Sequence, residues 1–135
     1  MSSPTYIYKL VPTSSPVPDI VPDVLPLSDL DANSGFIHLS TAAQIPNTLR
    51  HFFADQDAVY VLRLVYAHVE KEIRWEGPQA TVCGDRSDEG MFPHLYNGKP
   101  PKLGKDEVES VRLFTRVGDI WETTIIPEAQ GWLVE

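Results

Sequence analysis

The apolar positions of the chain fall into several short runs and one helical stripe. Runs rich in β-branched and aromatic residues favour strands, because these side chains pack well on a pleated surface. Predicted strands are residues 5–10, 36–39, 58–65, 73–76 and 108–117, with a further short run at 123–126. The run at 58–65 is the most continuously apolar of these, which predicts a central strand.

One principal helix is predicted near residues 42–54. Its apolar stripe has helical spacing and consists of Ile45, Leu49, Phe52 and Phe53. Thr41 and Gln44 have the spacing of a capping box, so Gln44 either caps the helix or offers its amide to a ligand. Pro46 is tolerated only in a first helical turn. The helix therefore begins near Ile45, or a separate turn precedes it.

Long connections separate these elements. Residues 11–34 are predicted to form a Pro-rich connection, since five prolines between residues 12 and 26 exclude a regular helix or central strand there. Its expected apolar anchors are Ile20, Val21, Val24 and Leu25. Residues 81–90 and 97–105 are predicted to be mobile loops, the first ordering over a cleft when a ligand binds. With no internal repeat or dividing linker, residues 1–135 are predicted to form a single α+β domain.

Composition narrows the functional classes. The 135 residues are 42% hydrophobic and 22% charged, as expected of one globular domain. No apolar run approaches the roughly 18 residues that cross a bilayer, and no secretory leader is recognisable, so a cytoplasmic location without a membrane partner is the default expectation. The net charge of −8 disfavours a nucleic-acid partner. The single cysteine, Cys83, has no partner for an internal disulfide.

The first candidate motif for chemistry lies in residues 35–41. In a strand, Ile37 and Leu39 point to the core, while Phe36, His38 and Ser40 share the opposite face. An imidazole and a hydroxyl side by side can grip a ligand, and histidine can titrate near neutral pH. The alternative is a buried histidine bonded to backbone, with Ser40 acting only as a helix cap.

Two further motifs add candidate residues. His94 would share one strand face with Tyr96, directly after the loop at 81–90. Arg74 and Glu76 also share a face: they form either an ion pair or a cation for an anionic ligand beside a general base. No third ligand accompanies the two histidines, so no metal site is predicted.

The runs at 35–44, 74–76 and 92–96 resemble, in order and spacing, the family catalogued as domain of unknown function 952. The resemblance spans Tyr6 to about Val111. It implies a split, strongly bent sheet of the ADP-ribosyltransferase-like kind, whose members bind nicotinamide adenine dinucleotide (NAD) in a cleft between two sheet halves. His38 with Ser40 then matches a ribose-holding histidine motif, and His94 matches the position of a late catalytic residue. The segment 96–101 is longer than the family's usual turn.

These observations predict a small-molecule enzyme with His38 and His94 facing a common cavity. The expected catalytic residues are His38, His94 and Glu76, and the expected ligand-binding residues are Ser40, Gln44, Arg74 and Tyr96. A transferase using NAD is the most specific version. A cofactor-free isomerase, lyase or cyclase on the same fold is the alternative, as is a non-catalytic module that binds a nucleotide or metabolite. The sequence names neither the substrate, the cofactor nor the oligomeric state.

Overall fold

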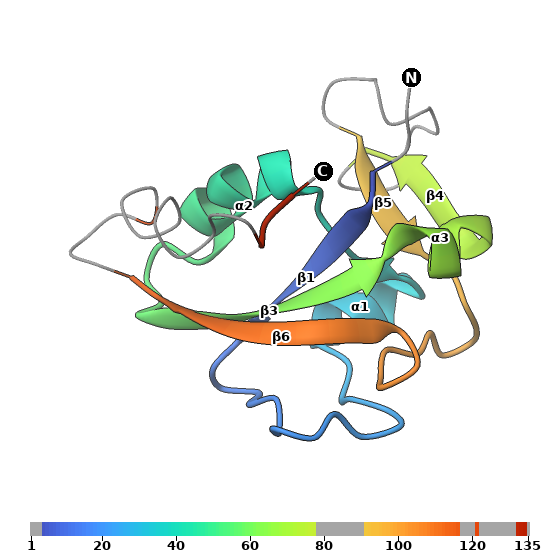
Figure 1. Cartoon of the computed structure of the whole chain (residues 1–135), viewed down its shortest axis with the longest axis horizontal. Helices are drawn as coiled ribbons and strands as arrows, with labels where there is room; N and C mark the ends of the chain where they lie inside the picture. Colours follow the sequence, from blue (N-terminus) through green and yellow to red (C-terminus); the bar gives the residue numbers. More distant parts are fainter. Residues whose placement is uncertain (1–3, 78–90, 117–120, 122–131, 135) are drawn as a thin grey trace.

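The computed structural model describes residues 4–77, 91–116, 121 and 132–134. Short strands and short helices alternate along the chain (Figure 1). In order, the elements are β1 (Tyr6–Pro12), α1 (Asp29–Ser34), β2 (Ile37–His38), the 3₁₀ turn η1 (Ala42–Gln44), α2 (Ile45–Phe52), β3 (Ala58–Val65), α3 (Tyr66–Val69), the 3₁₀ turn η2 (Glu70–Glu72), β4 (Ile73–Glu76), β5 (Phe92–Leu95) and β6 (Val108–Thr115). The predicted α+β class is confirmed, with small sheets and few helices in one domain.

The strands form two three-stranded sheets, ordered β1-β3-β6 and β2-β5-β4. All pairs are antiparallel. β3 is the central strand of the first sheet, as its apolar sequence predicts. A single bridge between Tyr8 and Ser40 joins the two sheets, with backbone bonds of 2.8 Å in each direction. This bridge sets the end of β2 beside the middle of β1.

The core consists of two apolar clusters on opposite faces of the β1-β3-β6 sheet. Alternation along β3 produces this division, since Val59 and Val61 point into one cluster and Leu62 and Leu64 into the other. Helix α2 covers the first face through Ile45 and Leu49 (Figure 1). The second face packs against the β2-β5-β4 sheet through Ile37, Leu39, Trp75 and Leu95. The site described below is built on the other side of that second sheet.

Helix α2 begins as the sequence analysis anticipates. The 3₁₀ turn η1 precedes it, and Pro46 lies in its first turn, where a missing N–H costs nothing. Ile45 and Leu49 are fully buried, but the prediction for Phe52 is wrong: its side chain is 74% exposed. Only Phe53 continues the stripe, half-buried against the cluster beneath α2. The helix ends at Phe52, so its last turn no longer follows the sheet surface.

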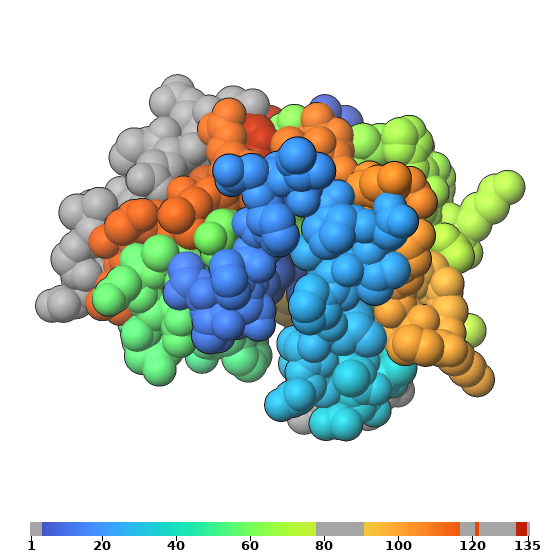
Figure 2. All heavy atoms as spheres, turned by 90° about the horizontal axis from the view of Figure 1, so that it is seen from below, coloured from blue at the N-terminus to red at the C-terminus, as the bar shows by residue number. Residues whose placement is uncertain are grey.

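The Pro-rich connection is anchored in part as predicted: Leu25 is buried and Val21 packs half-buried against the core. The prediction is wrong for Ile20 and Val24, which are 87% and 58% exposed, while Val17 is buried without having been predicted. The connection also contains the helix α1, which the sequence analysis did not predict. Between the connection, β1 and α1 lies a cavity of about 60 Å³ that Lys9 and Asp31 help to line. Figure 2 shows a hollow between the earlier, blue and the later, cyan parts of this N-terminal region.

Residues 97–105 are irregular, as predicted, and several bonds hold this segment. Asn97 exchanges two hydrogen bonds with the backbone of Lys102, at 2.7 and 2.8 Å. Leu103 is buried and accepts a backbone bond from Leu25. The predicted mobile loop at 81–90 and strand at 123–126 lie outside the described residues. Among the helices that the structure describes, none has the length and apolarity needed to cross a membrane.

Gly35 ends helix α1 in a left-handed conformation, with φ of 81°, and its N–H donates to the carbonyl of Asp31 at 3.0 Å. A side chain at this position would meet no atom within 4 Å. The cost of Gly35→Ala therefore comes from backbone strain alone, and we expect the free energy of unfolding to fall by about 1–2 kcal/mol. Gly35→Asn should cost less, because asparagine tolerates this conformation. Equal losses for both variants in urea denaturation would contradict this explanation.

Candidate functional site

Polar and aromatic side chains gather on the face of the β2-β5-β4 sheet that points away from the apolar core. The pleat explains this, because residues two apart share a face and directly paired residues point the same way. His38 pairs with His94, and His94 pairs on its other side with Arg74. The three residues therefore form one row across β2, β5 and β4. Phe36, Tyr96 and Glu76 belong to the same face.

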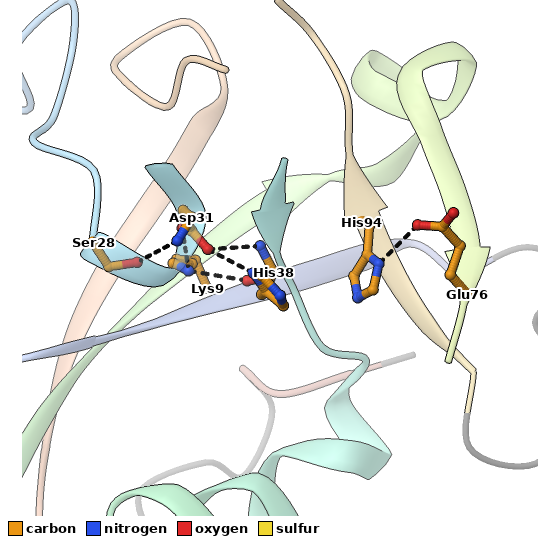
Figure 3. A network of polar contacts seen from close by, with 6 residues as sticks. All are labelled: Lys9, Ser28, Asp31, His38, Glu76 and His94. Atoms are coloured by element: carbon orange, nitrogen blue, oxygen red, sulfur yellow. Dashed lines mark hydrogen bonds and ion pairs between the residues drawn. The ribbon is translucent and has the colours of Figure 1, made fainter. Parts of the chain in front are cut away.

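The two imidazoles lie beside each other, with ring centroids 5.1 Å apart (Figure 3). Phe36 packs against both: its centroid is 4.5 Å from that of His38 and 4.4 Å from that of His94, nearly parallel to the latter. His94 is only 1% exposed, whereas the side chain of His38 is 22% exposed. The predicted proximity of the two histidines is confirmed, and a cavity in front of them stays a prediction.

His94 is held by a carboxylate on the neighbouring strand. Its Nδ1 lies 3.0 Å from Oε1 of Glu76, and the hydroxyl of Tyr96 donates to the same oxygen at 2.6 Å. Glu76 is 4% exposed. A carboxylate oxygen that accepts a hydroxyl proton also accepts most favourably from an imidazole N–H. Glu76 therefore orients His94 and is not placed as a separate base in the described geometry.

His38 is held in the same way by a different residue, Asp31 of α1. Oδ1 of Asp31 lies 2.7 Å from Nδ1 of His38 and accepts the backbone N–H of His38 at 3.2 Å. Oδ2 accepts from Nζ of Lys9 at 2.6 Å. In Figure 3 the two histidines lie between the two carboxylates, in the order Asp31, His38, His94, Glu76. Each histidine thus has its Nδ1 engaged by a carboxylate and its Nε2 left for other partners.

Burial and charge set the protonation states of this site. Burial lowers the pKa of His94 below its ordinary 6.5, and the hydrogen bond to Glu76 opposes this shift only in part. For Asp31, burial favours the neutral acid, but the bonds from His38 and Lys9 outweigh it and lower the carboxyl pKa below 3.8. Near pH 7 Asp31 is therefore ionised and His94 neutral. A neutral imidazole whose Nδ1–H faces a carboxylate presents a basic lone pair at Nε2.

Arg74 lies at the exposed edge of the site. Its guanidinium carbon is 4.5 Å from the ring centroid of Tyr96, a cation–π contact. Within the described ranges Arg74 makes no ion pair, so the alternative of an Arg74–Glu76 pair is not what the structure shows. The side chain is exposed and can meet an anionic group at the surface.

The structure gives Gln44 and Ser40 different places. Both ends of the Gln44 amide are engaged: Oε1 accepts from the Thr41 N–H at 2.9 Å, and Nε2 donates to the Met91 carbonyl at 2.6 Å. Gln44 therefore caps η1 and ties it to the start of β5, and the capping interpretation accounts for it fully. Ser40 is 5% exposed and lies beyond β2, at the bridge to Tyr8. In the described part of the chain its hydroxyl has no hydrogen-bond partner.

Sequence reasoning missed Asp31 and Lys9. The spacing of Ser28 and Gly35 could have predicted the short helix that contains Asp31, because serine is a common N-terminal cap and glycine a common C-terminal one. No pattern in the sequence joins Lys9 to Asp31. Among the residues that the structure describes, no group of three or more histidine, cysteine or acidic side chains is arranged to hold a metal ion.

Known structures with the same fold can be superimposed on most of this chain. The crystal structure of protein CC0527 from Caulobacter crescentus has a TM-score of 0.63 and 24% sequence identity, over 85% of this chain and 90% of that chain. A crystal structure of its double mutant gives the same values. Its solution NMR structure has a TM-score of 0.57 over 85% and 89% of the two chains, also at 24% identity. At this identity the likeness shows the fold alone.

No curated protein sequence shows significant similarity to the chain. The family described as "Protein of unknown function (DUF952)" matches residues 22–111. This span contains β2, β4 and β5, and with them both histidines and the two carboxylates that hold them. The chain therefore belongs to the DUF952 family.

Proposed function

We propose that this protein is a small-molecule enzyme in which His38 and His94 exchange protons with a bound substrate. One observation carries the proposal: two imidazoles with centroids 5.1 Å apart are each held at Nδ1 by a separate carboxylate. That arrangement fixes two Nε2 atoms in one small region. General acid–base catalysis requires this kind of positioned pair.

The two histidines have different roles in this proposal. His94 is the general base, because it is buried, neutral near pH 7 and carries its lone pair at Nε2. His38 is partly exposed, so solvent can reach it; once its Nε2 has taken up a proton, the imidazolium supplies the acid or restores the proton balance after turnover. Ser40, two residues after His38, supplies a hydroxyl to bind a substrate oxygen in this proposal. Glu76 and Tyr96 keep the His94 ring in place.

The most specific version is a transferase that uses NAD. Its support is the division of the strands into two small sheets and the place of His38 on an early strand beside Ser40, as the resemblance to ADP-ribosyltransferase-like proteins implies. The residues fit such a substrate in one respect: Nε2 acceptors suit the hydroxyl donors of a ribose. Arg74, exposed at the edge of the site, would meet the diphosphate.

A cofactor-free isomerase, lyase or cyclase uses the same pair without a dinucleotide. A non-catalytic metabolite-binding module would bind its ligand through the same two imidazoles without converting it. The paired carboxylate–histidine geometry favours an enzyme, because orientation of a ring nitrogen matters for proton transfer more than for simple binding. The three versions differ in which compound stabilises the protein and whether that compound is converted.

Ligand binding can be measured by thermal shift with NAD, ADP-ribose and a panel of common metabolites. A ligand that binds only the folded state raises the melting temperature, by an amount equivalent to about 2.7 kcal/mol at a concentration of 100 times its Kd. We expect at least one compound to stabilise the wild type and to lose its effect in His38→Gln. His38 is the preferred variant, since its partly exposed side chain makes a large loss of folding stability less of a risk than at His94.

The chain supplies its own matched controls, because His51 and His68 are both exposed and lie outside the three site motifs. His51→Gln and His68→Gln should retain the full thermal shift. An equal loss of the shift in these controls would contradict the proposal, as would an undiminished shift in His38→Gln. Conversion of the stabilising compound, followed by mass spectrometry, then separates an enzyme from a binding module.

The role of His94 as a neutral base predicts a dependence of stability on pH. Its folded pKa lies below its ordinary 6.5, so the unfolded chain binds more protons and stability falls as the pH drops from 6.5 through the folded pKa. One such group contributes at most about 1.4 kcal/mol per pH unit. Urea denaturation between pH 7 and pH 5 should show a shallower slope for His94→Gln than for the wild type and for His68→Gln. Identical slopes would show that His94 is not held neutral.

A further inference from the structure

Lys9, Asp31 and His38 form a continuous polar chain from β1 through α1 to β2 (Figure 3). Nζ of Lys9 donates to Oδ2 of Asp31 at 2.6 Å and to the carbonyl oxygen of His38 at 3.2 Å. Oδ1 of Asp31 in turn meets Nδ1 of His38 at 2.7 Å. The ammonium group of Lys9 therefore contacts both the Asp31 carboxylate and the backbone of His38, the histidine that this carboxylate orients.

Helix α1 is built around Asp31. The Ser28 hydroxyl accepts the N–H of Asp31 at 3.1 Å, and the carbonyl of Asp31 accepts from Gly35 at 3.0 Å. With its two carboxylate oxygens also bonded, every polar group of Asp31 has a partner within the described structure. The residue is 1% exposed, although α1 is only one and a half turns long and its other members are exposed. The position of this carboxylate is thus fixed from both the backbone and the side chain.

An ionised carboxylate only accepts hydrogen bonds, so the Nδ1 atom that faces Asp31 must carry a proton. The Nε2 atom of a neutral His38 is then unprotonated. This leaves Nε2 of His38 as an acceptor. The neighbouring His94 ring is oriented by Glu76 through the same nitrogen, Nδ1. Two unrelated elements, α1 and β4, thus impose one tautomer on neighbouring rings.

We propose that Asp31 is a positioning residue that locks His38 in the Nδ1–H tautomer, and that Lys9 holds Asp31 in the orientation required for this. The value of the lock for catalysis rests on the proposed function. The tautomer itself does not, and it can be observed without any ligand. The tautomer reports whether Asp31 orients the His38 ring, since a carboxylate bonded only to Lys9 and to backbone would leave either ring nitrogen free to carry the proton.

Lys9 makes the effect of Asp31→Asn predictable. An asparagine has one oxygen and one amide NH₂ group, and the charged Lys9 requires the oxygen as its acceptor. The NH₂ group then faces His38. It cannot accept the backbone N–H that Oδ1 of Asp31 accepts at 3.2 Å, a neutral bond weaker than the one from Lys9, and it meets Nδ1, which must accept. We expect His38 in Asp31→Asn to change to the Nε2–H tautomer. If Lys9→Met is added, the amide is free to turn its oxygen toward His38, and the Nδ1–H tautomer should return.

The measurement is a long-range ¹⁵N–¹H correlation spectrum of the full chain labelled at histidine and recorded near pH 7.5. This spectrum distinguishes protonated from unprotonated ring nitrogens. Loss of one signal set in His38→Gln assigns His38. Asp29→Asn is the matched control: Asp29 lies in the same helix, but it is exposed. It should leave the tautomer of His38 unchanged. Lys9→Met alone should also retain the Nδ1–H form.

Three results would overturn the proposal. The first is an Nε2–H tautomer for His38 in the wild type, a result that needs no variant to fold. The second is an unchanged tautomer in a folded Asp31→Asn protein. The third is an Nε2–H tautomer that persists in the folded Asp31→Asn/Lys9→Met double variant. That result would show that Lys9 does not set the orientation of the side chain at position 31. A protein that shows the predicted tautomers but binds none of the tested metabolites would contradict the proposed function and leave the positioning role of Asp31 supported.

Discussion

The antiparallel register of β2 against β5 is the constraint on which the site depends. It sets His38 directly opposite His94, and the pleat then turns both rings to the same face while Ile37 and Leu95 turn to the core. A slip of one residue in either strand would turn the imidazole of that strand into the apolar cluster and expose its aliphatic side chain. The burial of Ile37 and Leu95, both fully inaccessible, therefore specifies where the histidines point. Core packing and site geometry are two consequences of one register.

Short-range patterns predicted the parts of the structure that depend on local periodicity. The central strand at 58–65 and the strand at 73–76 have the predicted bounds, and Arg74 and Glu76 share the predicted face. Alternation of apolar and polar positions is sufficient for these features, since each depends on residues two apart. The proximity of His38 and His94 was also inferred, but from the resemblance between whole motifs. Periodicity alone does not pair strands that are far apart in the sequence.

The parts that could not be predicted depend on contacts between distant segments. Asp31 lies within a connection whose prolines argued against regular structure, yet α1 begins after the last of them. In the sequence, Lys9 is an ordinary polar position of an alternating strand. Its role follows only from the contact between β1 and α1, where it bonds Asp31. Phe52 has helical spacing, yet at the last residue of α2 its side chain is 74% exposed. In each case tertiary context, rather than local preference, decides the outcome.

The cost of burying these polar groups bears on whether the site is functional or structural. Buried ion pairs contribute little net stability, because desolvation offsets much of their attraction, and apolar residues of similar size often serve as well. Here two carboxylates and one histidine are at most 4% exposed, beside a sheet whose opposite face already provides an apolar core. A purely structural role would need at most one buried carboxylate–histidine pair. Two pairs with the same Nδ1 connection, on adjacent strands and with differing exposure of their rings, are what a proton-transferring site requires, and this is the strongest physical reason to look for a substrate between them.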